Sequence, residues 1–342
     1  MADKVRFAFV GLGHFSDVLA DAATKSKRIE IAACCSRTEA KMAAFTAKFG
    51  GVAKKTYEEV LKDDRINAVV LTTPNTLHAP QTIEAAKHGK HVFVEKPMAL
   101  SVADCKQMIL AAKGAKVVLA VGHKERKLAR TRKAKELIDK GAVGQIVLAE
   151  ANHSDSGGLT VKPDNWKWYR KEMPAGPVGP LTIHHADNLN YLVGPVKKVT
   201  GFMSKVCTKA EPDDVIAAVV EFQNKALGYI GGTWVTPIRK YVQIHGTDGV
   251  ILVDQEGGAV YYQQKSVTKG IGTLVRQVCP PEGYREQRTE AVAEEMEEFA
   301  ACIQDGKKPE TGGEEGLAAW AVIEAMIKSA ESGVPIEINQ LL

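Results

Sequence analysis

Cysteine is scarce in this chain and is not arranged for metal binding. The six cysteines form no CxxC pair and no other familiar metal-ligand spacing. Cys34 and Cys35 are adjacent within an apolar stretch, where buried thiols are expected rather than a disulfide. The histidines add no familiar zinc spacing, so we expect no bound metal.

Long apolar runs are also missing. No apolar segment approaches the length of a membrane-spanning helix. The first residues, MADKVRFAFVG, lead almost at once into a strand pattern and do not resemble a signal peptide. We therefore expect a cytoplasmic protein in a reducing compartment, with no membrane association.

The excess of one charge sign is small. The net charge of +4 and the isoelectric point near 8.6 suit anionic small molecules but are too weak to indicate nucleic-acid binding by themselves. Residues 123–141 carry eight Lys and Arg against three acidic residues. This segment is either a phosphate or nucleic-acid patch or a connecting helix with a solvated basic face, and the second interpretation is favoured.

Two patterns divide the 342 residues, a length that favours two domains. In the first third, apolar strands alternate with helical patterns, which is typical of parallel βαβ units. After residue 145 most segments are β-rich and joined by turn-like pairs, which favours an antiparallel sheet, and helical patterns return at the C-terminus. We predict an α/β protein with a Rossmann doubly wound parallel sheet in residues 1–124. Residues 125–342 are predicted to form an α/β domain with a large open, mostly antiparallel sheet for substrate binding and oligomerisation, whose C-terminal helices could pack on the first domain.

A glycine turn joins the first strand to the first helical pattern. Gly11 and Gly13 lie in VGLGHFSD, where a tight turn would bring the backbone close to a pyrophosphate at the helix N-terminus. Ser16 stands where the dinucleotide fingerprint has a third small residue. An ordinary strand–helix turn is the alternative, but the repeated βα units favour a dinucleotide site that includes His14 and Phe15.

The end of the second strand indicates which dinucleotide is preferred. An acidic residue there would bind the ribose 2′-hydroxyl of NAD, but the chain has Ser36, Arg37 and Thr38. Arg37 can pair with the 2′-phosphate of NADP, and the two hydroxyls can hydrogen-bond to it. We predict NADP over NAD, although an Arg37 that only stacks on the adenine would permit either.

Several longer segments together resemble one family. They are GLGHFSD, TTPNTLHAPQTIEAAKHGKHVFVEKPMAL, VGHKERK and HHADNLNYLVGPVKKV. The chain resembles the Gfo/Idh/MocA oxidoreductases, which include glucose–fructose oxidoreductase and inositol dehydrogenase, over essentially its whole length. The resemblance implies a Rossmann domain followed by an α/β domain whose open sheet serves in oligomerisation.

The resemblance also implies functional residues. Lys96 of the Glu95-Lys96-Pro97 motif would lie beside the nicotinamide and contact both cofactor and substrate, rather than being a solvated strand end. His184 matches the family's catalytic histidine. Four residues before it, where the family often carries an aspartate, this chain has Pro180, and Thr182 is the nearest polar group. The residues that match the loop lining the cofactor cleft are Thr72, Pro74, Asn75 and His78.

The residue chemistry fits hydride transfer without the family. Lys96 could stabilise a developing alkoxide, and a desolvated lysine has a lowered pKa suited to proton exchange. His184 could act as the acid or base, although a core histidine is the alternative, and Asp187 lies three residues on, where it could orient His184. Further candidates for substrate contact are His123 with Lys124 after the strand at 116–122, Thr182, and Trp166, Trp168 and Arg170, the last three of which could equally form a structural flap.

We therefore predict an NAD(P)-dependent dehydrogenase or reductase. It would transfer a hydride between nicotinamide and a secondary alcohol or ketone of a sugar, cyclitol or related hydroxylated compound. The alternatives are a redox-neutral enzyme that cleaves glycosides with tightly bound NAD, and a non-catalytic NADP sensor. The second face of the antiparallel sheet needs a cover, so we expect a homodimer or homotetramer.

Overall fold

The structure is a computed structural model that describes residues 3–174, 176, 179–254, 259–264, 273–277 and 284–342, with only the backbone described from 259 to 287. The chain forms two compact units. Unit 1 comprises Met1–Lys124 and Thr289–Leu317, and unit 2 comprises Glu125–Arg288 and Ala318–Leu342. No described helix is both long and apolar enough to cross a membrane.

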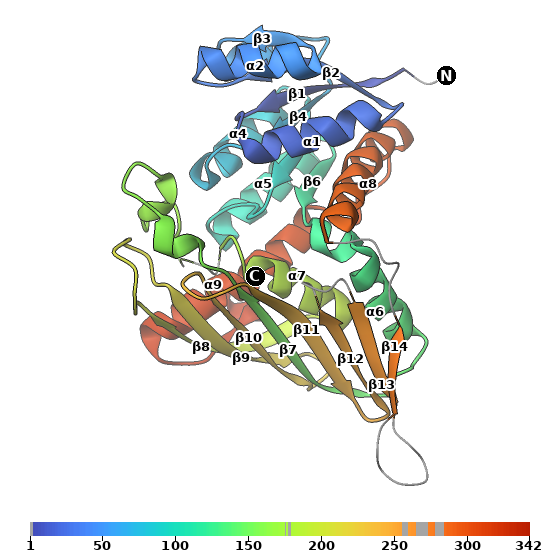
Figure 1. The fold of residues 1–342 in the computed structure, drawn as a ribbon. Coiled ribbons are helices and arrows are strands. Elements are labelled where there is room, and N and C mark those ends of the chain that lie inside the picture. Colours follow the sequence, from blue (N-terminus) through green and yellow to red (C-terminus); the bar gives the residue numbers. More distant parts are fainter. Residues whose placement is uncertain (1–2, 175, 177–178, 255–258, 265–272, 278–283) are drawn as a thin grey trace. The chain divides into compact units, whose positions relative to one another are not determined.

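Unit 1 is built on a six-stranded sheet in which every neighbouring pair is parallel (Figure 1). In spatial order, the strands are β3 (Val52–Lys54), β2 (Ile29–Cys35), β1 (Val5–Val10), β4 (Ala68–Leu71), β5 (His91–Glu95) and β6 (Leu119–Gly122). The sequence pattern predicted all of these except the three-residue β3, which is too short to show a period.

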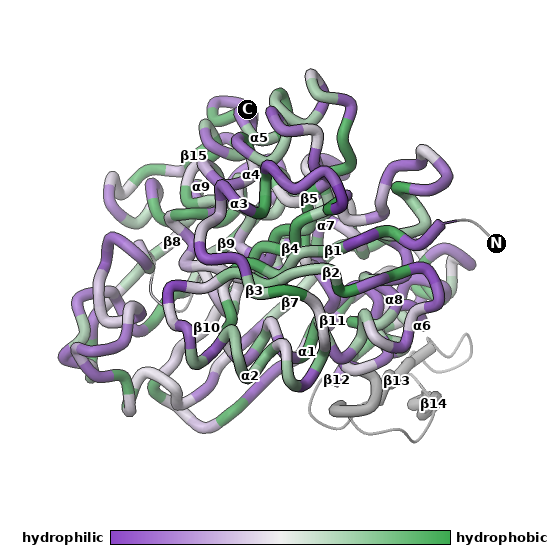
Figure 2. The backbone as a smooth tube through the Cα atoms, turned by 90° about the horizontal axis from the view of Figure 1, so that it is seen from above, coloured by the Kyte–Doolittle hydropathy of each residue, from purple (hydrophilic) through white to green (hydrophobic). Residues whose placement is uncertain are grey.

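Helices cover both faces of this sheet. On one face lie α1 (His14–Lys25), α2 (Glu39–Phe49) and the part of α8 (Tyr284–Asp305) that belongs to unit 1; on the other lie α4 (His78–Lys87) and α5 (Val102–Ala115). Phe7 and Phe93 both pack against Phe299 of α8. All four residues of β4 are buried, and Figure 2 shows that strand as a wholly hydrophobic (green) segment. A strand covered on both faces has no polar side, so it reads as a continuous apolar run.

Unit 2 contains a nine-stranded sheet in which β7 and β10 pair in parallel and all other neighbours are antiparallel. In spatial order, the strands are β14 (Thr273–Gln277), β13 (Ala259–Gln264), β12 (Gly249–Asp254), β11 (Arg239–Gly246), β7 (Ile146–Ser154), β10 (Leu227–Thr233), β9 (Val215–Phe222), β8 (Val196–Ser204) and β15 (Ile336–Glu337).

Helices cover one face of this second sheet. They are α6 (Ala129–Asp139), α7 (Ile183–Leu192) and the later part of α9 (Gly313–Ser332). In β9, Ile216, Ala218 and Val220 are buried, whereas Val219 between them is 55% exposed. The predicted fold class, a parallel Rossmann sheet followed by an open and mostly antiparallel sheet, is confirmed.

Candidate active site

The glycine turn of unit 1 is crowded at Gly11 and open at Gly13. Gly11 has φ +87°, and a Cβ there would lie 2.8 Å from the backbone nitrogen of Thr73. A side chain at this position would therefore collide with the neighbouring loop. Gly13 is the N-cap of α1, and the space where its Cβ would stand is open. The turn thus leaves room for a pyrophosphate at the N-terminus of a twelve-residue helix.

The residues that follow four neighbouring strands share one edge of the sheet. The register pairs Val10 with Leu71, Leu71 with Val94, and Glu95 with Gly122. Gly11, Thr72, Lys96 and His123 therefore all emerge at the carboxyl ends of aligned parallel strands. This edge is where open α/β sheets bind their ligands.

Arg37 lies at the same edge, two residues beyond the end of β2. Cys35, the last residue of β2, pairs with Val10 of β1. The side chain of Arg37 is exposed, and the backbone N–H of Thr38 donates to the hydroxyl of Ser36 at 3.4 Å. The backbone N–H of Gly11 donates to the carbonyl oxygen of Cys35 at 3.0 Å, so the end of β2 lies next to the glycine turn.

His78 connects two of the predicted motifs. Its ring is 1% exposed, with Nδ1 2.8 Å from the carbonyl oxygen of Pro97 and Nε2 3.0 Å from that of Thr73. Burial lowers the pKa of His78, while the two carbonyl oxygens oppose that shift. The hydroxyl of Thr72 donates to the carbonyl oxygen of Gly11. Through these two contacts, His78 connects the Thr72–Asn75 loop to Pro97, the residue that follows Lys96.

The Glu95-Lys96 pair ends β5. The carboxylate of Glu95 lies over Gly122 so closely that a Cβ there would overlap it. Lys96 is half-buried, and its backbone N–H donates to Glu95 Oε2 at 3.2 Å. On the next strand, His123 is fully buried, and the Nζ atom of Lys124 lies 5.2 Å from the ring centroid of Phe15. The Glu95 carboxylate fixes the backbone at the N–H of Lys96, and the contact between Lys124 and Phe15 brings the start of α1 to the end of β6.

In unit 2, three histidine rings lie together. His153 of β7 is stacked on His184 of α7 with ring centroids 5.9 Å apart, and it contacts His185 at 5.5 Å. Nε2 of His185 donates to the carbonyl oxygen of Asn152 at 2.8 Å, and burial lowers the pKa of His185 to about 4. His185 is therefore a neutral core histidine at pH 7, whereas His184 keeps 5% exposure.

Asp187 forms a buried ion pair that the sequence did not reveal. Arg126 Nε donates to Asp187 Oδ2 at 3.0 Å and Nη2 donates to the other oxygen, with side-chain exposures of 7% and 1%. The guanidinium carbon of Arg126 also lies 5.0 Å from the ring centroid of Tyr191. The predicted contact between Asp187 and His184 stays a prediction, because the structure gives Arg126 as the partner of this carboxylate.

The prediction of a solvated basic face over residues 123–141 is wrong for the first half of that segment. Arg126 and Lys127 are nearly buried, and Arg130 is fully buried with Glu125 3.5 Å away. Among the lysines of this segment, Lys133 and Lys135 are half-buried and only Lys140 is exposed. Helical periodicity did not identify Arg126 as buried, because its carboxylate partner Asp187 lies 61 residues away.

Two family models match nearly the whole chain. The one for an oxidoreductase family with an NAD-binding Rossmann fold matches residues 5–123, and the one for the C-terminal alpha/beta domain of the same family matches residues 135–338. The chain belongs to the Gfo/Idh/MocA oxidoreductase family. It is therefore an NAD(P)-dependent oxidoreductase, and the predicted family and enzyme class are confirmed.

The individual relatives include a reductase, an oxidoreductase and a hydratase. A 1,5-anhydro-D-fructose reductase of Ensifer adhaerens is 28% identical over 88% of this chain and 89% of its own. A 2,7-anhydro-N-acetylneuraminate hydratase of Escherichia coli is 31% identical over 56% of this chain and 52% of its own. The crystal structure of an oxidoreductase from Desulfitobacterium hafniense, for which NADPH dependence is proposed, is 30% identical. It covers 100% of this chain and 99% of its own with a TM-score of 0.90.

The other predicted substrate residues of this oxidoreductase have varied surroundings within unit 2. Trp166 is 37% exposed, whereas Trp168 packs against a small cluster around Trp234. Arg170 is engaged by Asp213 at 2.9 Å. Thr182 is fully buried just before α7. Of these side chains, Trp166 has the greatest freedom to meet a ligand.

Proposed function

We propose that this enzyme transfers a hydride between the nicotinamide of NADP and a secondary alcohol or ketone of a sugar, cyclitol or related hydroxylated compound. The observation that carries the proposal is the convergence of the glycine turn, the Thr72–Asn75 loop, Lys96 and His123 on one edge of the parallel sheet. The reductase from Ensifer adhaerens supports the substrate class. We propose residues 1–124 as the cofactor domain, with Thr289–Leu317 packed in the same unit, and the rest of residues 125–342 as the substrate and oligomerisation domain, in a cytoplasmic enzyme.

The residues present fit a dinucleotide. We assign the pyrophosphate to the open space at Gly13, next to His14 and Phe15, and the 2′-phosphate to Arg37 with Ser36 and Thr38. The nicotinamide, when bound, supplies the hydride acceptor or donor. We propose that the loop of Thr72, Pro74 and Asn75, positioned by His78, and the end of β5 at Glu95 line the rest of the cofactor site.

Two side chains are proposed to handle charge and proton at the reacting oxygen. The ammonium of Lys96 would stabilise negative charge on that oxygen, and the half-burial of this side chain limits competition from water. His184 would exchange the hydroxyl proton. Asp187, fixed by Arg126, would hold the N-terminal turn of α7 that carries His184. His123, Trp166, Arg170 and Thr182 remain proposed substrate contacts.

Replacing Lys96 by Ala tests the catalytic assignment. A screen of sugars, cyclitols and hydroxy acids, followed by absorbance at 340 nm, should first identify a substrate. Lys96→Ala should then lower kcat by about 100-fold or more, because one preorganised stabilising group is lost. NADPH affinity, measured by fluorescence titration, should change by less than about threefold. Lys87→Ala, an exposed lysine at the end of α4, is the control. Full activity of Lys96→Ala would refute the assignment.

Replacing Arg37 by Ala tests the cofactor preference. An Arg–phosphate contact at an exposed site should contribute about 1.5 kcal/mol or more, so the Kd for NADPH should rise about tenfold. The Kd for NADH should change little, because NADH has no 2′-phosphate. An equal effect on both cofactors would show that Arg37 stacks on the adenine, and the NADP preference would be withdrawn.

The relationship to a hydratase favours a second candidate, a redox-neutral enzyme with tightly bound NAD. In that case the nicotinamide would remain on the protein through gel filtration, and turnover would cause no net change at 340 nm. Exchange of the cofactor at each turnover, with stoichiometric NADPH formation or consumption, would eliminate this candidate.

A further inference from the structure

A pocket lies at the other edge of the parallel sheet, away from the proposed cofactor site. Its volume is about 480 Å³, within the range of small-molecule sites. The pocket adjoins the beginnings of β5 and β6, at His91 and Leu119. The cofactor residues follow the ends of the same strands, so the two sites are separate.

The pocket has an apolar floor. Ile109 and Ala112 of α5 are buried, as is Leu119 at the start of β6, and Ile303 of α8 completes this surface. Gly313 closes the wall, and a Cβ there would lie 2.7 Å from Ile109 Cγ1. An organic body that contacts this floor would gain from the burial of apolar surface.

Charged side chains surround the opening with an excess of lysine. Lys113 pairs with Glu314 at 2.7 Å, and that contact, together with the nearby charge of Lys308, lowers the pKa of Glu314. No described carboxylate lies within ion-pair distance of Lys308. Glu315 is occupied as an acceptor from the backbone N–H of Gly312 at 2.9 Å. The lining as a whole thus carries four lysines, Lys113, Lys116, Lys307 and Lys308, against two glutamates, Glu314 and Glu315.

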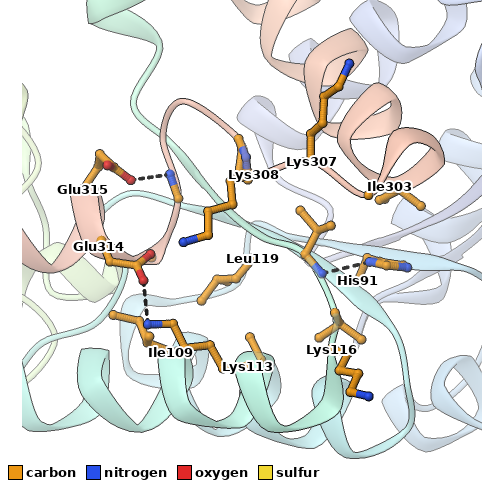
Figure 3. A pocket seen from close by; sticks show the side chains of 17 residues that line it. His91, Ile109, Lys113, Lys116, Leu119, Ile303, Lys307, Lys308, Glu314 and Glu315 are labelled. Atoms are coloured by element: carbon orange, nitrogen blue, oxygen red, sulfur yellow. Dashed lines mark hydrogen bonds and ion pairs between the residues drawn. The ribbon is translucent and has the colours of Figure 1, made fainter.

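The direction of the side chains distinguishes one lysine from its neighbour. Figure 3 shows Lys308 directed into the pocket toward Glu314, whereas Lys307 and Lys116 point away from it. Lys307 is instead paired with Asp305 at 3.2 Å. Lys308 is therefore positioned to meet an anion above the apolar floor.

The wall that carries these charges is fixed to the sheet. Gly312 forms an antiparallel bridge with Ala120 of β6, and the backbone N–H of Val121 donates to Thr311 at 2.8 Å. The segment before α9 therefore continues the edge of the sheet, which holds Glu314 and Glu315 in place. A preformed pocket of this kind loses little freedom when it binds a ligand.

We propose that this pocket binds a small organic carboxylate with an apolar body. The carboxylate would pair with Lys308, and the body would lie on Ile109, Ala112 and Leu119. The excess of lysine over glutamate in the lining favours a ligand with a negative charge. The inference concerns a site apart from the proposed hydride-transfer reaction and does not depend on it.

The test measures binding of benzoate to the full-length protein saturated with NADPH, by isothermal titration calorimetry. Benzamide, which has the same ring without the charge, should bind at least about tenfold more weakly, because an ionic hydrogen bond is lost. Lys308→Gln should raise the Kd for benzoate about tenfold. Lys307→Gln, the adjacent residue that points away, should change it by less than about twofold.

Three results would overturn the proposal. The first is an absence of benzoate binding at millimolar concentrations. The second is equal affinity for benzoate and benzamide, which would show that charge plays no part. The third is benzoate binding that is unchanged in Lys308→Gln or equally weakened in Lys307→Gln, which would place the ligand elsewhere. Because Lys308 is exposed, both variants should retain the unfolding temperature of the wild type.

Discussion

The two sheets of this oxidoreductase differ in how many of their faces are covered by helices. The central strands of unit 1 are covered by helices on both faces, and β4 is buried at every residue. Among the described residues, helices cover the sheet of unit 2 on one face only, and in β9 buried and more exposed residues alternate. The comparison shows that a continuous apolar run and an alternating one report how many faces of a strand are covered.

The units also differ in where their polar groups lie. In unit 1 the proposed site uses backbone and side chains at strand ends, next to a helix N-terminus. In unit 2 an ion pair and three histidines are buried around α7. Buried charges are stable only while both partners remain, so unit 2 should be the more sensitive to polar substitutions.

Arg126→Met should have the largest effect on stability. It would leave Asp187 buried without its charged partner, at an expected cost of about 3–5 kcal/mol in the free energy of unfolding. Urea denaturation would measure it. The exposed Arg239, 3.6 Å from the half-buried Asp254, provides a control, and Arg239→Met should cost less than about 1 kcal/mol.

The double variant Arg126→Met/Asp187→Leu separates charge from packing. Removing both charges should recover much of the stability lost in the single variant, because no unpaired carboxylate remains. If the double variant were as unstable as Arg126→Met, the loss would arise from packing against Tyr191, and the contrast between the units would be weaker.

His185 should make unit 2 sensitive to acid. Its pKa is about 4 in the folded protein, below the ordinary value of 6.5, so between these values the unfolded chain binds more protons. The contribution of His185 to the free energy of unfolding is therefore complete above pH 6.5. As the pH falls toward 4, about 3 kcal/mol of this free energy is lost. Unfolding free energies measured from pH 7 to 4 should show a flatter dependence in His185→Gln. His14→Gln, at an exposed histidine, is the control, and an equal change in both variants would contradict the assignment.

A matched pair of valines tests the two sheets directly. Val70 of β4 is fully buried, and Val219 of β9 is 55% exposed. Val70→Ala should lower the free energy of unfolding by about 2 kcal/mol, and Val219→Ala by less than about 0.5 kcal/mol at low protein concentration. A loss at Val219 that grows with protein concentration would show that an oligomer covers this face.

The sequence predicted the elements that depend on neighbouring residues. Apolar runs located the strands of unit 1, and the motifs around Gly11 and Lys96 placed candidate residues at strand ends that the register brings to one edge. The pairing of Arg126 with Asp187 was not predictable, because its partners are 61 residues apart. The burial of the His78 ring between two carbonyl oxygens was not predictable either, because a motif identifies a residue but not the groups that surround it.

The smallest effect on protomer stability is expected at the open face, where the predicted oligomer contact lies. Phe202 of β8 is 73% exposed, and the register places it on the same face as Val219, Leu227 and Leu148. Such a row of exposed apolar residues is typical of a contact surface. Phe202→Ser should therefore shift the mass measured by light scattering toward smaller species, with an unchanged circular dichroism spectrum. The control is Val206→Ser, an exposed apolar residue beyond the end of β8, which should keep the wild-type mass. If the wild-type protein is monomeric at micromolar concentration, the predicted oligomer contact is wrong. The apolar face of the second sheet that carries Phe202 would then be exposed to water in solution.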